Sequence, residues 1–384
     1  MMNFEFANPV KLLFGEGQIA KISNEIPKGS KILMTYGGGS IKKNGVYDQV
    51  IKALEGFDIV EFGGIEANPD YATLIKAVKV CKEDKIDCIL AVGGGSIIDG
   101  SKFIAAAAKY DGDAWDLIVK QVPIKDALPL ATVLTLPATA SEMNSGGVIS
   151  RRETKEKYPF FSPLLFPKFS VLDPTVIYSL PERQIINGVI DTYIHIVEQY
   201  LTTTDHYMVT DRLAEGILKN LIELSPALLS NTKPSYDTCA NFMLTATMGL
   251  NGWTSMGATQ DWATHMIGHE LTALAGLDHA VTLAIVYPAT MKVMRKEKEA
   301  KILQYAERVW GIVDGTIDER IDLAIAKTEE FFIQTGMKVR LSDHSVGQDV
   351  IDIIVKRFED RGMNLGEGGI VTPAHVRMIL EDRI

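Results

Sequence analysis

The segment Cys88-Ile-Leu-Ala-Val-Gly-Gly-Gly-Ser-Ile-Ile-Asp-Gly-Ser-Lys-Phe-Ile-Ala-Ala-Ala-Ala108 passes from a short apolar run through three glycines into an alanine-rich stretch. An apolar run of this length that ends at glycine is typical of a buried strand, and the stretch after it favours a helix. A strand that turns directly into a helix is the repeating unit of a parallel sheet covered by helices. The segment therefore predicts an α/β fold for this part of the chain.

The same pattern recurs through the first half of the sequence. Three further apolar runs end at glycine or proline: Lys31–Tyr36 before Gly37-Gly-Gly-Ser40, Asp58–Phe62 before Gly63-Gly64, and Thr132–Leu136 before Pro137. Helical patterns separate them over Tyr71–Asp84 and Ser101–Lys109. This alternation predicts a Rossmann-like parallel-sheet domain over residues 1–180.

The second half of the sequence reads as helical. Strand patterns largely disappear after Ser170-Val-Leu-Asp-Pro174, and Pro181 is suited to the first turn of a long helix. Helical patterns then cover Glu215–Leu224, Tyr236–Leu250 and Ile321–Gly336. We expect an α/β domain followed by an all-helical domain over residues 181–384, and we detect no internal repeat.

Composition limits the classes of function. The chain has 384 residues, 46% of them hydrophobic, and a net charge of -10, which argues against a surface for DNA or RNA. The N-terminus lacks the pattern of a signal peptide, and no apolar run is long enough to span a bilayer. Three cysteines form neither a zinc motif nor a disulfide framework. We expect a cytoplasmic protein without nucleic-acid or membrane partners.

The glycine turn at Gly94, Gly95 and Ser96 is a candidate cradle for a pyrophosphate. Glycine lets a backbone approach a ligand closely, and the N–H groups at a helix start attract phosphate. The turn matches neither the GxGxxG nor the P-loop fingerprint, so an ordinary strand-to-helix turn is the alternative. Asp99, in the first helical turn, could simply complement the helix dipole.

The turn Gly37-Gly-Gly-Ser40-Ile-Lys42-Lys43 favours NADP over NAD. Enzymes selective for NAD usually hold the adenosine ribose with an acid after a strand, and no acid stands here. Small residues and two lysines leave room and positive charge for a 2′-phosphate; the alternative is a bare turn with solvated lysines. A third polar turn, Thr135-Leu-Pro-Ala-Thr139-Ala-Ser141-Glu-Met-Asn144, could contact a cofactor or cap the next helix.

Histidines and one aspartate show metal-ligand spacing. Asp191 and His195 stand four residues apart, as do His265 and His269, so each pair shares one helix face. His279 follows Gly276, a plausible helix stop, and can return from another direction. Such pairs also occur as ordinary surface pairs. If they bind a metal, the five candidates leave one group over for catalysis.

Together, these motifs in this order resemble the iron-containing alcohol dehydrogenase family over essentially the whole chain. The segments Phe62-Gly-Gly-Ile-Glu-Ala-Asn-Pro69 and Gln260-Asp-Trp-Ala-Thr-His-Met-Ile-Gly-His-Glu-Leu-Thr-Ala273 are similar to its butanol dehydrogenase branch, which includes broad-substrate NADP-dependent aldehyde reductases. The resemblance implies that Asp191, His195, His265 and His279 bind the metal and that His269 faces the nicotinamide and the substrate. It implies cofactor contacts from Gly37, Gly38, Ser40, Gly94, Gly95, Ser96, Asp99, Thr135, Thr139, Ser141, Asn144 and Lys157.

Two positions depart from the family pattern. Ala140 stands where a glycine is commoner, and Asp278-His279-Ala280 replaces a Pro-His-Gly around the last ligand. Neither change removes a ligand. Ala140 bears on how closely the backbone approaches the nicotinamide.

The resemblance implies hydride transfer between NADP(H) and short-chain aldehydes or primary alcohols, assisted by one divalent ion, Fe²⁺ or Zn²⁺. It also implies a dehydroquinate synthase-like architecture and a homodimer, with Phe4-Glu-Phe6 as a candidate strand at the dimer contact. Two alternatives stay open: a metal-dependent lyase resembling dehydroquinate synthase, and a non-catalytic metal-binding or nucleotide-binding protein.

Overall fold

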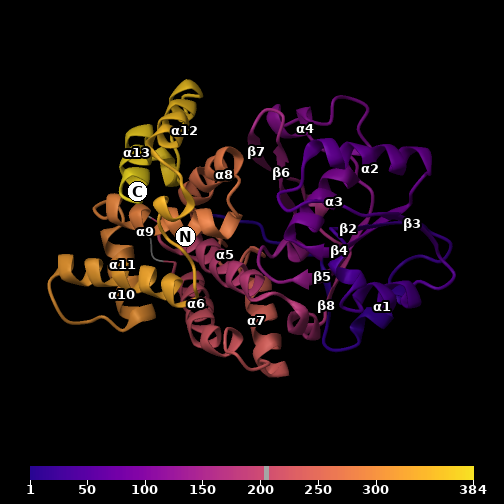
Figure 1. Cartoon of the computed structure of the whole chain (residues 1–384), viewed down its shortest axis with the longest axis horizontal. Coiled ribbons are helices and arrows are strands. Elements are labelled where there is room, and N and C mark those ends of the chain that lie inside the picture. Colours follow the sequence, from indigo (N-terminus) through magenta and orange to yellow (C-terminus); the bar gives the residue numbers. More distant parts are fainter. Residues whose placement is uncertain (203–206) are drawn as a thin grey trace. The chain divides into compact units, whose positions relative to one another are not determined.

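The computed structural model describes residues 1–202 and 207–384. Their packing forms two compact units (Figure 1), which are described one at a time. The sheet unit comprises Ala7–Ile185 and Ser230–Asn251, and the helical unit comprises the described residues of Met1–Phe6, Ile186–Leu229 and Gly252–Ile384. The domain boundary near residue 180 stays a prediction.

The sheet unit is built on a six-stranded sheet with the order β1-β8-β5-β4-β2-β3. All of its neighbouring strands pair in parallel. Its strands are β1 (Lys11–Phe14), β2 (Lys31–Tyr36), β3 (Asp58–Phe62), β4 (Cys88–Gly94), β5 (Leu130–Leu136) and β8 (Phe169–Leu172). The central strands β4, β5 and β8 are almost continuously buried, as expected for strands covered on both faces.

Helices cover the sheet, with α2 and α3 on one side of the strands and α1 on the other (Figure 1). The helices of this unit are α1 (Val46–Ala53), α2 (Tyr71–Glu83), α3 (Gly95–Ala107), α4 (Asp116–Val119) and α7 (Tyr236–Met248). Helix α3 begins at Gly95, six residues before the start expected from the sequence, because the glycine turn itself forms the first helical turn. An antiparallel hairpin, β6 (Gly146–Arg151) and β7 (Glu156–Phe161), stands apart from the sheet.

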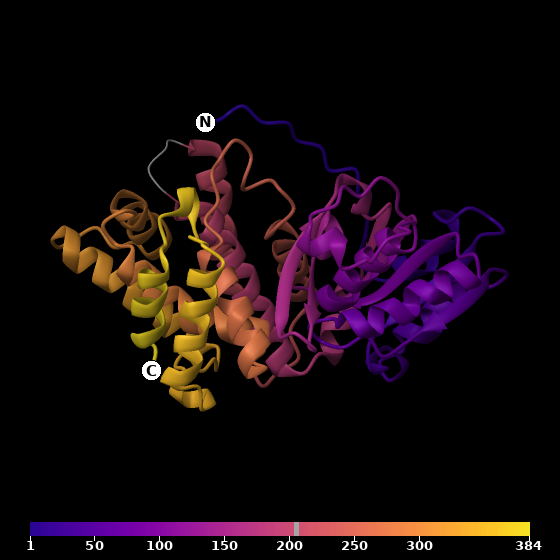
Figure 2. The same cartoon turned by 90° about the horizontal axis from the view of Figure 1, so that it is seen from above.

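The helical unit contains no strand among its described residues. Its helices are α5 (Glu182–Tyr200, which begins in the sheet unit), α6 (Met208–Leu228), α8 (Ala263–Ala275), α9 (His279–Val293), α10 (Glu299–Trp310), α11 (Ile317–Gln334), α12 (Gln348–Asp360) and α13 (Pro373–Glu381). Helices α8, α9, α12 and α13 share one apolar core, and the two yellow helices α12 and α13 lie side by side in both views (Figure 1, Figure 2).

The predicted order, a parallel sheet with covering helices followed by an all-helical part, is confirmed. Within the single chain residues 1–10 form no strand, and the first strand begins at Lys11. A strand at Phe4–Phe6 that pairs across a dimer contact stays a prediction. Among the described residues, no helix is both long enough and apolar enough to cross a membrane.

Candidate functional site: glycine turns and a histidine cluster

The glycine turns meet at one edge of the sheet. Strands β2, β4 and β5 are neighbours and run in parallel, so their carboxyl ends lie together. After β2 come Gly37, Gly38 and Ser40. Gly94 is the last residue of β4, and Gly95, Ser96 and Asp99 come after it. Thr135 lies near the end of β5, and Thr139, Ser141 and Asn144 come after that strand. Ligands of open α/β sheets bind at this edge, and the arrangement is suited to a nucleotide.

The glycines of these turns serve two different physical needs. A Cβ on Gly95 would come within 2.4 Å of both Cγ2 and Oγ1 of Thr139, so packing between the two turns requires a glycine there. A Cβ on Gly38 would meet nothing within 4 Å, so that backbone faces open space. Gly38 therefore has the accessible backbone that a bound phosphate needs, whereas Gly95 holds the turn after β5 against α3.

Two of the predicted cofactor residues are joined by a lysine that sequence reasoning missed, and one of them bonds a third. Lys102, fully buried on α3, donates to Ser141 Oγ (2.9 Å), Asn144 Oδ1 (2.9 Å) and the Gly146 carbonyl (2.6 Å). Ser141 in turn donates to Asp99 Oδ1 at 2.5 Å. Burial lowers the pKa of Lys102 to about 8, and burial also raises the pKa of Asp99. This network fixes the shape of the turn after β5; cofactor contacts from these side chains stay a prediction.

Lys157 reaches the same edge from the hairpin. Its ammonium donates to Asn68 Oδ1 at 2.8 Å, and the Asn68 backbone N–H donates to Ser96 Oγ at 3.3 Å. Asn68 has a left-handed backbone (φ 53) and stands before a proline, which is the sequence signal that marks it as a turn residue. The structure thus brings Lys157 to the glycine turn after β4.

Lys42, proposed from the sequence to favour a 2′-phosphate, has a partner that the sequence did not predict. Its ammonium lies 3.3 Å from Glu61 Oε2 and 5.0 Å from the ring centroid of Tyr36. Glu61, on the neighbouring strand β3, also accepts from the hydroxyls of Tyr36 (2.8 Å) and Tyr47 (2.6 Å). Part of the charge of Lys42 is therefore already compensated.

In the helical unit, the structure collects all five predicted metal-site residues. Asp191 and His195 come from α5, His265 and His269 from α8, and His279 begins α9. Gly276 ends α8 in a left-handed conformation (φ 70), as its position predicted, so the chain turns back. Asp191, His195 and His265 are buried and offer ligand atoms that all lie within 4.8 Å of one another.

The remaining two histidines adjoin this group. His279 Nε2 lies 3.7 Å from Asp191 Oδ1, and His195 Nδ1 lies 3.8 Å from the same oxygen. His269 follows one turn after His265, and its ring centroid lies 5.3 Å from that of His279. The cluster therefore contains one carboxylate and four imidazoles, the five candidates that the spacing singled out.

These distances suit a bound cation. Separations of 3.7 and 3.8 Å are too long for hydrogen bonds. Two ligand atoms each about 2.1 Å from a tetrahedral ion lie about 3.4 Å apart, close to what is observed. Asp191 Oδ1 is moreover a buried acceptor with no hydrogen-bond partner among the described residues. A divalent ion would satisfy this oxygen, although the ligand roles themselves stay predictions.

Two neighbours of the cluster were missed from the sequence. Glu198, on α5, contacts His265 Nδ1 and accepts from the backbone of α8. Burial, and secondly the carboxylate of Asp261, raise the pKa of Glu198, whereas the backbone N–H groups of Thr264 and His265 and the charge of Lys298 lower it and favour the carboxylate. Trp262 packs edge-on against the ring of His265, with the two ring centroids 5.0 Å apart, and so borders the cluster on that side. Glu198 could have been found from its spacing of seven residues after Asp191.

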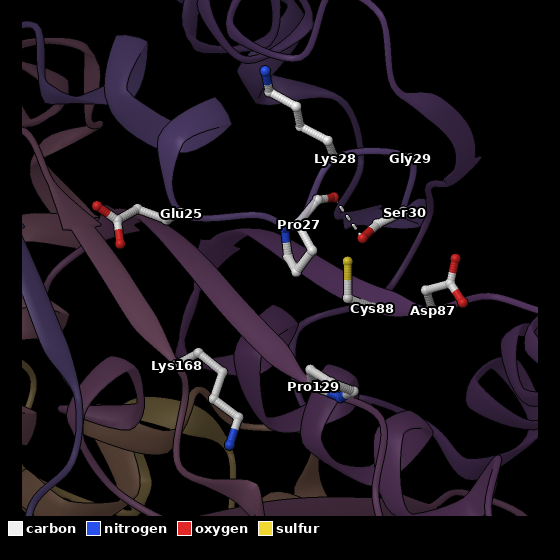
Figure 3. A pocket seen from close by; sticks show the side chains of 9 residues that line it. All are labelled: Glu25, Pro27, Lys28, Gly29, Ser30, Asp87, Cys88, Pro129 and Lys168. Carbon is white, nitrogen blue, oxygen red and sulfur yellow. Dashed lines mark hydrogen bonds between the residues drawn. The ribbon is translucent and has the colours of Figure 1, made fainter.

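A depression at the opposite edge of the sheet, where the strands begin, contains none of the predicted site residues (Figure 3). Lys28 and Lys168 line it together with Glu25 and Asp87, so its charges are mixed. Burial raises the pKa of the Cys88 thiol in its wall to about 11, which leaves little thiolate at neutral pH. We assign no chemistry to this depression.

Comparison with known proteins decides the family. The model of the iron-containing alcohol dehydrogenase family matches residues 9–174, and the model of its C-terminal part matches residues 185–379. The chain belongs to the iron-containing alcohol dehydrogenase family. The resemblance expected from the sequence is confirmed.

Individual relatives match nearly the whole length of the chain. It is 52% identical to the NADPH-dependent aldehyde reductase YqhD of Escherichia coli K12, over 99% of both chains. It is 45% identical to the probable NADH-dependent butanol dehydrogenase 1 of Bacillus subtilis 168, over 94% of this chain and 95% of that one. The crystal structure of E. coli YqhD superposes with a TM-score of 0.98 at 51% identity, covering 100% of this chain and 99% of that chain.

The glycine turns generate a stability prediction. Gly95→Ala should lower the free energy of unfolding by about 1–3 kcal/mol, because the added methyl group overlaps Thr139 in a packed interior. Gly38→Ala is the matched control and should leave the stability of the cofactor-free protein nearly unchanged. Denaturant titration of both variants measures this difference. Equal losses in the two variants would contradict the packing role of Gly95.

Proposed function

We propose that this protein is a metal-dependent NADP(H) alcohol dehydrogenase and aldehyde reductase that interconverts short-chain aldehydes and primary alcohols. The observation that carries the proposal is the 52% identity over 99% of both chains with a protein named NADPH-dependent aldehyde reductase. A second observation is the buried group of Asp191, His195 and His265. Carboxylate and imidazole are ligands that suit Zn²⁺ and Fe²⁺, and either ion can act as a Lewis acid.

Each part of the chemistry has candidate residues. The divalent ion would be held by Asp191, His195, His265 and His279. Only one of these ligands is anionic, so the site would keep a net charge of +1. When bound, the ion supplies a Lewis acid for the aldehyde oxygen, and the nicotinamide supplies or accepts the hydride. Ligand type allows Fe²⁺ or Zn²⁺.

Residues of the sheet unit would hold the cofactor. The accessible backbone at Gly38 and the N–H groups at the start of α3 are suited to its phosphates. Lys102 would keep Ser141 and Asn144 in place beside them. The lysines after β2 favour NADP over NAD, and of the relatives compared above, one is named for NADPH and one for NADH.

The surroundings of the metal site favour a small uncharged substrate. Between Trp253 and Leu277 the sequence contains no Lys or Arg. Lys298, a buried lysine of the helical unit, is paired with Asp261, two residues before α8, at 2.6 Å. A lyase acting on an anionic sugar phosphate would need several unpaired basic groups, so this observation weighs against that alternative. A homodimer and a cytoplasmic location remain predictions from the sequence.

The proposal has a direct test. Purified protein should oxidise NADPH when butanal or another short aldehyde is added, should lose this activity after chelation, and should regain it with Fe²⁺ or Zn²⁺. Absorbance of NADPH and elemental analysis of the protein measure both effects. If no aldehyde drives oxidation of NADPH or NADH in reloaded protein, the proposed function is wrong.

Cofactor preference should depend on the lysines after β2. Lys43→Ala and Lys42→Ala should each raise KM for NADPH by up to roughly fivefold, because exposed charge pairs contribute ~0.2–1 kcal/mol, and should leave KM for NADH unchanged. The effect should be smaller at Lys42, whose charge Glu61 partly compensates. Lys52→Ala on α1, also exposed, is the control. Parallel changes for both cofactors would refute recognition of the 2′-phosphate.

His269 is the proposed proton relay to the alkoxide. His269→Ala should lower kcat roughly 100-fold or more, in the range that a general acid or base contributes, and should remove one ionisation from the pH profile of kcat. Metal content should stay at the wild-type value, because His269 is the histidine left over from the ligand set. His344→Ala, in the 3-10 helix Ser342–His344, is the control. Full activity with an unchanged pH profile would exclude the relay.

A further inference from the structure

Helix α5 bears a third polar side chain on the face that carries Asp191 and His195. Glu198 stands seven positions after Asp191 and three after His195, so helical periodicity aligns the three side chains along one stripe. Its side chain is only 1% exposed. A carboxylate buried to this extent is costly unless hydrogen-bond donors surround it.

The donors all come from the first turn of α8. The backbone N–H of Thr264 donates to Glu198 Oε1 at 2.6 Å, and that of His265 donates to Oε2 at 3.2 Å. Helix starts leave such N–H groups without intrahelical acceptors, and Trp262, the residue before α8, provides no side-chain cap. Glu198 therefore caps α8 from a different helix.

The same carboxylate also contacts the ring of His265 at Nδ1. An acceptor at Nδ1 favours the tautomer that has its proton on this nitrogen, and the ring lone pair is then on Nε2. Because backbone and ring of His265 are both bonded to one carboxylate, the ring is also restricted in rotation. A carboxylate in this position orients a metal-binding histidine and raises its basicity.

The main chain of Glu198 is hydrogen-bonded to Asp261, whose side chain forms a buried ion pair with Lys298. Asp261 donates its backbone N–H to the Glu198 carbonyl at 2.8 Å, and its carboxylate accepts from Ala263 N–H at 3.1 Å. Lys298 binds the other oxygen of Asp261 at 2.6 Å, and both side chains are almost fully buried. The loop before α8 is thereby fastened to α5.

We propose that Glu198 is a positioning residue of the metal centre: it holds His265 as the Nδ1–H tautomer, so that Nε2 is the ligating nitrogen, and it fixes the start of α8 against α5. This inference rests on the metal role proposed for His265. Glu198 does not bind the metal, the cofactor or the substrate in this assignment. Its effect reaches the chemistry only through His265.

Zinc affinity of the metal-stripped full chain tests the proposal. Glu198→Gln keeps the size of the side chain but replaces one acceptor oxygen by an N–H₂ group that faces donors. Its dissociation constant for Zn²⁺ should rise roughly 10- to 100-fold, the range typical for loss of such a partner. Competition with a coloured zinc chelator measures it, and Zn²⁺ affinity within twofold of the wild type would overturn the proposal.

A matched control is Glu215→Gln. Glu215 is another buried carboxylate of the helical unit, but it bonds Arg308 and Arg212 and none of the five cluster residues. Its substitution should leave Zn²⁺ affinity unchanged. If the wild-type protein bound no Zn²⁺, the metal site itself would be wrong; an unaffected Glu198→Gln variant of a zinc-binding protein would refute the role of Glu198 alone.

A second measurement does not depend on a folded Glu198 variant. In zinc-loaded wild-type protein labelled with ¹⁵N-histidine, long-range ¹H–¹⁵N correlations report which ring nitrogen carries the proton. The signals of His265, assigned through their loss in His265→Gln, should show a protonated Nδ1. The opposite tautomer, with the proton on Nε2, would overturn the proposal whether or not Glu198→Gln folds.

Discussion

A carboxylate that is removed from water must be matched by hydrogen-bond donors or by a positive charge, and this constraint organises both units of the protein. In the sheet unit, Asp99 is matched by Ser141, a backbone N–H and the nearby ammonium of Lys102. In the helical unit, Glu198 is matched by the start of α8. Asp191 differs, because one of its buried oxygens has no hydrogen-bond partner in the described part of the chain. A cation is the natural complement of such an oxygen.

In the proposed function the sheet unit would bind the cofactor and the helical unit would bind the metal, and the secondary structure of each unit suits its role. The parallel sheet gathers three strand ends at one edge, and there the turns expose backbone N–H groups suited to phosphate. Helices instead present side chains at fixed intervals, which suits a shell of imidazoles around an ion. The sheet unit thus offers backbone N–H groups, and the helical unit offers side chains.

Much of this arrangement could be predicted from local patterns. Strands Lys31–Tyr36 and Asp58–Phe62 begin and end where the apolar runs do, and the four-residue spacings placed Asp191 beside His195. Features that depend on partners distant in sequence could not be predicted. Helix α7 reads as a helix, but only tertiary packing assigns it to the sheet unit. Lys102 looks like an ordinary helical lysine until its three acceptors, about 40 residues away, are known.

The common stripe on α5 limits how this helix can change during evolution. One residue inserted between Asp191 and Glu198 would rotate everything after it by about 100° around the helix axis. The carboxylate of Asp191 and the cap of α8 would then face different directions, and no side-chain substitution could restore both. We therefore expect the length of this stretch to be more constrained in homologous chains than the identity of the residues between its polar positions, and gaps in their alignments to avoid it.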